Sequence, residues 1–297
     1  MSQSIQTKVK DYMGKSEIKK NAFQRFLQRF SGNGLALIAF VLLILIIAMS
    51  IFAPYIAPYN PAKGNIVNRL KPPTFERTAD MNFPHIMGTD QQGRDVLSRI
   101  IYGGRVSMSV AFTVVFIAGA IGTFLGLIAG YFGGWIDMII MRLVDISSSF
   151  PGLLIALTFV MVLGPGQKNL TVALLLVGWM IHARMARSQV LTARESTMVE
   201  SSKAIGCSMP RILFCHILPN VISPLITTYV LEMAHMIGAE ANMSFLGYGI
   251  QPPASSWGLM IGEGRQYITS AWWLVLCLNL VGNWVREEFD PLQKDRY

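Results

Sequence analysis

Long apolar runs separated by polar stretches dominate the pattern of hydrophobic and polar positions along this 297-residue chain. A helix needs about 20 apolar residues to cross the hydrocarbon core of a bilayer. Five such runs are clear and a sixth is marginal. They cover residues 35–56, 106–131, 138–163, 170–185, 221–246 and 268–285. The pattern predicts an all-α integral membrane protein with about six transmembrane helices.

The positions of lysine and arginine predict how these helices are oriented. Fifteen of them lie before the first run, from the end of the fourth run to the start of the fifth, and after the last run, whereas nine lie in the loops on the opposite side. Cytoplasmic loops carry an excess of basic residues. We therefore expect both termini, and the loop between the fourth and fifth runs, to be cytoplasmic.

The same pattern divides the chain into four regions. In the first, residues 1–33, four apolar residues between Phe23 and Phe30 recur at helical spacing, with arginines on the other face. This is typical of an amphipathic helix that lies in the membrane interface. We expect a first transmembrane helix and outer loop over 34–105, a core transmembrane domain over 106–285 with a cytoplasmic loop at about 192–219, and a cytoplasmic tail over 286–297.

Composition narrows the classes of function. With 52% hydrophobic and 14% charged residues, the chain is too apolar for an ordinary soluble domain. Basic residues that flank the apolar runs account for the net charge of +8, so nucleic-acid binding is not expected. The three cysteines lack metal-ligand spacing, and no zinc, nucleophile or phosphate-loop motif is complete. We therefore expect no catalytic residue, cofactor or metal.

Ionisable residues inside the apolar runs are candidates for function, because charge there is costly, and five of them form two constellations. Arg142 and Asp145 are three residues apart, which permits an ion pair along one helix face, and Glu232 and His235 repeat that spacing before Glu240. One interpretation is a polar wall along a translocation path. The other is packing against the polar face of another subunit. We favour the first, because charges at that depth rarely face lipid.

A polar segment at residues 200–219 separates the fourth and fifth runs. It reads ESSKAIGCSMPRILFCHILP, in which Gly206 can form the left-handed turn that ends a short helix, and Pro210 and Pro219 bracket the next piece. A compact helix of this kind can insert into a cleft on another protein. The pattern alone leaves a plain hydrophilic connector equally open.

This segment resembles the E-A-A-x-x-x-G…L-P signature of bacterial ABC importer permeases. Glu200 and Gly206 are in register with that signature, and a Leu-Pro pair ends it. Two small serines, Ser201 and Ser202, stand where the signature has alanines, and His216 stands where isoleucine is usual. The serines keep the side chains small, so docking should persist.

Three further blocks are similar to the dipeptide/oligopeptide/nickel family of these permeases. GTDQQGRDVLSRIIYGGRVSMSV at 88–110 resembles the subunit class with the GTDxxGRD block, which pairs with a second, homologous permease. RLVDISSSFPGLLIAL at 142–157 and SFLGYGIQPPASSWG at 244–258 are similar to the same class. Together these blocks cover most of the chain beyond residue 85.

The resemblance implies a fold of the type I ABC importer permease kind in the bacterial inner membrane. It also implies a complex that moves peptides or similar solutes inward. The partners in that complex are a homologous second permease, two ABC ATPases that hydrolyse the ATP, an extracellular solute-binding protein and membrane lipid. The residues that it implies for coupling to the ATPase are Glu200, Ser201, Ser202, Lys203, Ala204 and Gly206.

Two other classes of function do not require the coupling signature. A proton-coupled secondary transporter would import solute on a proton gradient without an ATPase. A membrane scaffold subunit would bind partners and carry nothing.

The outer loop and the last run add two expectations. The loop between the first and second runs is long enough to be functional, and we assign it to contacts with the binding protein and the sister permease. Its charged residues Asp90, Arg94, Asp95 and Arg99 should form local structural pairs. The last run lacks about a dozen apolar residues that family members have, and residues 271–285 would reach only about 22 Å as a helix.

Overall fold

A computed structural model describes residues 34–76 and 83–274 of the chain. It divides into two units, Met1–Leu45 and Ile46–Tyr297. The described part of the first unit is helical throughout and belongs to α3, Gly34–Ile51. The expected interfacial helix before residue 34, the C-terminal tail and most of the last apolar run lie outside the described residues.

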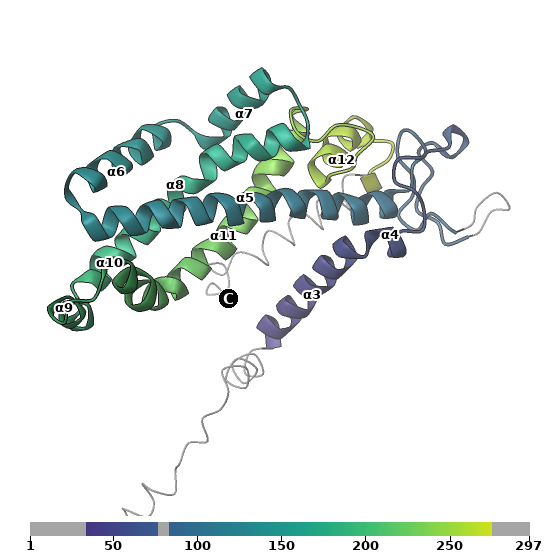
Figure 1. Cartoon of the computed structure of the whole chain (residues 1–297). Helices are drawn as coiled ribbons and strands as arrows, with labels where there is room; N and C mark the ends of the chain where they lie inside the picture. Colours follow the sequence, from purple (N-terminus) through teal and green to yellow (C-terminus); the bar gives the residue numbers. More distant parts are fainter. Residues whose placement is uncertain (1–33, 77–82, 275–297) are drawn as a thin grey trace, which may run out of the picture. The chain divides into compact units, whose positions relative to one another are not determined.

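Helices account for all the regular structure of the described residues, apart from a single isolated bridge between Thr89 and Asp95. The all-α expectation is thereby confirmed for this part of the chain. After α3 the elements are α4 (Ala53–Ile56), η1 (Ile66–Asn68), α5 (Val96–Phe132), α6 (Gly134–Ser148), α7 (Gly152–Leu163), α8 (Gln167–Arg194), α9 (Thr197–Ala204), α10 (Met209–Arg211), the π-helix η2 (Ile212–Ile217), α11 (Leu218–Phe245), α12 (Trp257–Gly264) and η3 (Arg265–Tyr267), as drawn in Figure 1.

Three continuous helices in the described residues are long and apolar enough to cross a membrane. They are Val96–Phe132, Gln167–Arg194 and Met209–Phe245, which contain the predicted runs at 106–131, 170–185 and 221–246. The first of these helices begins ten residues before the predicted run, at the N-cap Asp95, whose side chain accepts a hydrogen bond from the backbone of Ser98 at 2.8 Å. Charged residues in its first turns hid this extension from a count of apolar residues.

The predicted span at 138–163 is broken in the structure. α6 and α7 bend by 81° at residues 149–151, so they form one span only as a bent pair. Pro151 explains the break, because proline disfavours helical geometry at the residue before it. The predicted run therefore does not form one continuous helix, since hydropathy reports which residues are apolar and not where the backbone turns.

Helix α8 packs along α5 (Figure 1), and the two helices approach so closely that their backbones are in contact. Gly122, Gly126 and Gly130 of α5 recur at every fourth residue on the face towards α8. A Cβ atom on Gly122 would lie 2.2 Å from the carbonyl oxygen of Trp179, and one on Gly126 would lie 2.3 Å from that of Ala183. Real atoms never approach so closely, so only glycine fits. Small residues allow this close packing between helices in a membrane.

The N-terminal end of α5 is fixed by a cluster of four charges, of which Asp90, Arg94 and Arg99 are buried and Glu263 is half-buried. Asp90 accepts a hydrogen bond from Arg94 Nε at 2.6 Å and another from Arg99. Glu263 of α12 accepts from the same two guanidiniums, at 2.9 Å from Arg94 and 2.7 Å from Arg99. The two buried guanidiniums are thus balanced by two carboxylates, as buried charges require. The expectation of local structural pairs is confirmed, although Asp95 pairs with His85 instead, at 2.8 Å.

We predict that Gly126→Ala separates α5 from α8. The new methyl group would meet a backbone oxygen that cannot rotate away, and overpacking of this kind costs about 1–3 kcal/mol. The midpoint of thermal unfolding in detergent should fall. Gly238→Ala, at a helical glycine with no atom within 4 Å of the added Cβ, is the matched control and should change little. Equal midpoints for the two variants would refute the close-packing argument.

We also predict that Glu263→Gln destabilises the packing at the N-terminal end of α5. It leaves two buried guanidiniums with a single carboxylate, and removing one partner of a buried charge cluster costs about 3–5 kcal/mol. Thermal unfolding should report the loss. Glu76→Gln, at an exposed carboxylate in the segment between η1 and α5, should leave the midpoint of thermal unfolding unchanged. If both variants unfold like the unaltered protein, the cluster does not hold the loop.

Candidate coupling site and translocation path

The polar segment after α8 folds into a short helix and a glycine turn. Ser196 caps α9 by accepting a hydrogen bond from the backbone of Val199. The helix ends at Ala204. Two residues later Gly206, whose φ of 78° lies in the left-handed region, donates its N–H to the Lys203 carbonyl at 3.0 Å. The short helix and its terminating turn, predicted from the sequence, are confirmed as local structure.

The exposed face of this helix holds most of the residues expected for coupling. Glu200, Ser201, Lys203, Ala204 and Gly206 are exposed.

One expected coupling residue faces inward. Ser202 is buried and donates its hydroxyl to the Met198 carbonyl at 2.7 Å, so its side chain is not available to a partner in this conformation. Ile205, by contrast, is 80% exposed directly after the helix and was not among the expected residues. An apolar side chain inside a polar segment was the signal that could have identified it.

The buried side of α9 ties it to two long helices. Val199 is fully buried in an apolar cluster that contains residues of α5, α8, η2 and α11. The other buried members of that cluster are Leu127, Ala186, Val190, Ile212, Leu213, Ile217, Val221 and Leu225. α9 is therefore packed against the end of α8 and, through the π-helix, against the start of α11. π-helical turns are rare and occur frequently at functional sites.

Two of the residues expected along a translocation path lie on α6. Arg142 and Asp145 are both exposed, but they do not form the intrahelical ion pair that their spacing permits. Asp145 pairs instead with Arg184 of α8, at 3.5 Å. The α6 carboxylate thus contacts a neighbouring helix, because the bend after α6 leaves that helix lying against α8.

The other three residues lie on α11. The pair between Glu232 and His235 forms, with Nδ1 of the imidazole 3.0 Å from Oε1 of the carboxylate. The His235 side chain is 69% exposed, whereas Glu232 is mostly buried. Glu240 has no exposed surface and accepts a hydrogen bond from Ser244 at 2.7 Å. Its side chain is therefore enclosed by the elements around α11, and its place along a translocation path stays a prediction.

A buried histidine in the middle of the helix packing was missed from the sequence. His182 of α8 lies with Nδ1 3.0 Å from the Gly178 carbonyl oxygen, and its ring meets the ring of Tyr229 edge-on, 4.6 Å between centroids. The Tyr229 hydroxyl is 3.3 Å from that of Thr123 on α5. Tyr229 is one helical turn before Glu232. These polar side chains therefore form a line across the interface between α5, α8 and α11. Isolated histidines in a sequence give no signal of such a line.

Within residues 34–76 and 83–274, no group of three or more histidine, cysteine, aspartate or glutamate side chains could hold a metal ion.

The comparisons with known proteins identify the family. The model of binding-protein-dependent transport system inner membrane components matches residues 122–295, more than half of the chain. The chain belongs to this family, and its resemblance to the ABC importer permeases is confirmed. Residues 21–73 match the N-terminal transmembrane domain of oligopeptide transport permease C.

Relatives align over nearly the full length. The dipeptide transport system permease protein DppC of Alkalihalophilus pseudofirmus is 39% identical over 88% of this chain and 87% of its own. DppC of Haemophilus influenzae is 37% identical over 93% and 96%. A crystal structure of an amino acid ABC transporter covers 66% of this chain and 90% of its own with a TM-score of 0.50, at 15% identity, which supports the fold alone.

Proposed function

We propose that this chain is the translocation subunit of an ATP-driven importer for dipeptides, oligopeptides or similar small solutes. It lies in the bacterial inner membrane with both termini in the cytoplasm. The observation that carries the proposal is α9, an exposed helix packed onto two long apolar helices, in a chain whose relatives are named dipeptide transport permeases.

The coupling step uses this arrangement mechanically. Helix α9 is the centre of a coupling loop at about 192–219. Two ABC ATPases bind and hydrolyse ATP, and the closure of this pair pushes on the exposed face of α9. Because Val199 is packed into the cluster beneath, α9 cannot shift alone, and the ends of α8 and α11 move with it. Rigid-body movement of this kind is how alternating access is achieved in known switches. A homologous second permease forms the other half of the passage.

The passage is lined by residues of both signs. A peptide carries an ammonium group at one end and a carboxylate at the other. The exposed residues Arg142, Asp145 and His235, with Glu232 behind the imidazole, offer partners for both groups. Glu240 would join them only in a conformation in which α11 separates from the elements packed around it. An extracellular binding protein selects the solute and delivers it to the outer mouth.

The chain performs no covalent chemistry in this scheme. Glu200, Ser201, Lys203, Ala204 and Gly206 transmit movement, and Ser202 holds the helix that presents them. All ATP hydrolysis belongs to the partner subunits.

We predict that Gly206→Val and Glu200→Lys each uncouple transport. Valine at a left-handed position is strained by about 1–2 kcal/mol and changes the end of α9, although no neighbouring atom would be hit. The lysine reverses the charge on the exposed face. ATP-driven peptide uptake by proteoliposomes that contain the complete complex should fall at least about tenfold, while membrane insertion stays intact.

Gly247→Val is the matched control, since Gly247 has a φ of 87° and equally open surroundings at the other end of α11. It carries the same strain away from α9 and should retain coupled uptake. Normal ATP-driven uptake in both α9 variants would contradict the coupling assignment. Import on a proton gradient without ATPase subunits would instead favour a secondary transporter.

A further inference from the structure

A tyrosine of α11 fills a notch in the surface that α5 and α8 present to it. Tyr229 lies against Gly119 of α5, where an added Cβ atom would be 2.5 Å from Cε1 and 2.6 Å from Cζ of the tyrosine ring. Real atoms do not approach so closely, so only glycine leaves room for the ring. We call this space the Gly119 notch. Its other walls are Phe116 and Thr123 of α5 and His182 of α8.

The contact in the Gly119 notch differs in kind from the contact that joins α5 to α8. An added Cβ atom at Gly122 or Gly126 would meet a backbone carbonyl oxygen, which cannot move unless the whole helix moves. At Gly119 the three nearest atoms all belong to the side chain of Tyr229, and a side chain can rotate or withdraw. The contact between α5 and α8 is therefore fixed, whereas the tyrosine contact can break and form again.

One nitrogen beside the notch has no hydrogen-bond partner among the described residues. His182 is 1% exposed, and its Nδ1 lies 3.0 Å from the Gly178 carbonyl oxygen, so in the neutral ring Nδ1 carries the proton and Nε2 is an acceptor. Nε2 is buried and accepts from no group. A buried polar atom without a partner is costly, and contact with water would satisfy it. The histidine therefore favours a conformation in which the tyrosine ring no longer covers it.

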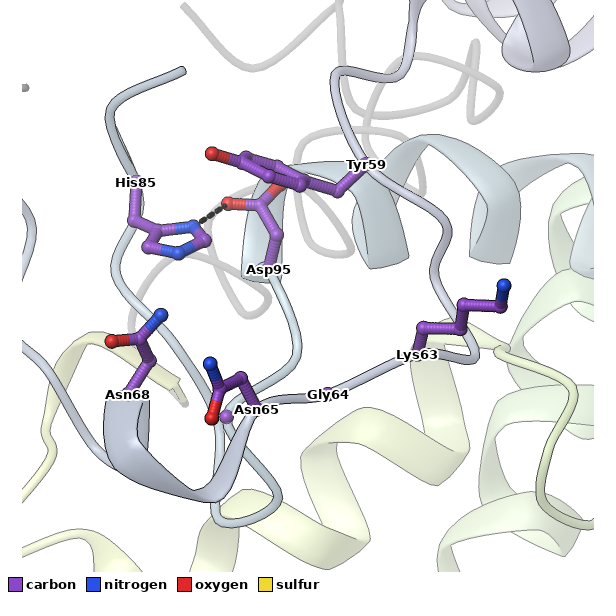
Figure 2. Close-up of a pocket in the computed structure, with 8 residues that line it drawn as sticks. Tyr59, Lys63, Gly64, Asn65, Asn68, His85 and Asp95 are labelled. Carbon is purple, nitrogen blue, oxygen red and sulfur yellow. Dashed lines mark hydrogen bonds and ion pairs between the residues drawn. The ribbon is translucent and has the colours of Figure 1, made fainter. Parts of the chain in front are cut away.

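The other buried histidine shows how such a ring is held in a fixed part of the structure. Nδ1 of His85 lies 2.8 Å from Oδ1 of Asp95, and both side chains line a small pocket together with Tyr59 (Figure 2). A carboxylate thus satisfies this ring. No carboxylate of the described residues lies within ion-pair distance of His182. On its Nε2 side, His182 is held by packing alone.

Helix α11 contains a point at which its angle can change. Pro224 lies inside the helix, five residues before Tyr229. Proline has no backbone N–H to donate within the helix, and helices kink at such positions. The part of α11 that carries Tyr229 can therefore swing away from the α5–α8 body while Val221, before the proline, stays in the apolar cluster around Val199.

We propose that Tyr229 is a latch between α11 and the α5–α8 body. In the present conformation its ring fills the Gly119 notch and covers His182. During the transport cycle α11 swings away, the ring leaves the notch, and water from the passage reaches Nε2 of the histidine. This inference rests on the proposed function for the transport cycle itself. The latch and its parts come from the packing of the three helices.

Cysteine labelling in the complete complex tests whether the ring leaves the notch. With the three native cysteines replaced, Thr123→Cys places a thiol beside the ring of Tyr229. The rates at which a water-soluble maleimide labels this thiol should differ by at least about fivefold between the nucleotide-free and the ATP-bound complex, because the ring covers it in only one conformation. Ser109→Cys, at an exposed position on the same helix, is the control and should be labelled at similar rates in both.

Two variants remove the latch from opposite sides of the contact. Tyr229→Val removes the ring, and Gly119→Ala fills the notch. Each should raise the number of ATP molecules hydrolysed per peptide imported by at least about fivefold, because α11 is no longer held between transport steps. The double variant should be no worse than either single variant, because both changes remove the same contact. Tyr229→Phe keeps the ring in the notch and should stay close to the unaltered ratio.

Three results would overturn the proposal. If ATP-driven uptake proceeds while the thiol at residue 123 is labelled at the same rate in both nucleotide states, the ring never leaves the notch. If both variants keep the unaltered ratio of ATP to peptide, the contact does not hold α11. If their effects add, they act at separate places. An unaltered complex that imports no peptide on ATP would instead contradict the proposed function, and its uptake is measured separately.

Discussion

The close approach of α5 and α8 is the constraint on which the rest of this structure depends. In a bilayer there is no hydrophobic force to drive helices together, so their packing relies on small residues that let backbones touch. Gly122, Gly126 and Gly130 supply that contact along three turns of α5. The contact makes α8 and α5 one body. Since α9 follows α8 after two residues, any force on α9 acts on that body and not on a loose loop.

The two ends of this body hold charge in opposite ways. At the N-terminal end of α5, the buried residues Asp90, Arg94 and Arg99 and the half-buried Glu263 neutralise one another, which suits a fixed platform. At the other end, the charged residues of α9 are exposed and have no buried partner among the described residues, which suits a surface that meets another protein. The apolar cluster around Val199 packs against that helix and the long helices, so in the proposed mechanism it would carry a movement of α9 to them.

The sequence predicted the three continuous membrane helices, the short helix α9 and its glycine turn, because each depends on local composition or on a single special residue. It could not predict features that depend on how helices face one another. The bend before Pro151 redirects α6, so Asp145 meets Arg184 and not its helical neighbour Arg142. The inward direction of Ser202 follows from the register of α9 on the cluster beneath, which no pattern in the segment reveals.

The central claim is that the exposed face of α9 contacts an ATPase and moves with it. Cysteine cross-linking tests this most directly, with the three native cysteines replaced and a single cysteine placed at Ile205. The account predicts a cross-link from this position to an ATPase subunit whose yield changes between the nucleotide-free and ATP-bound complex. A cysteine at Val162, 81% exposed near the end of α7, should give none. No ATPase cross-link at residue 205, or the same yield at both positions, would contradict the account.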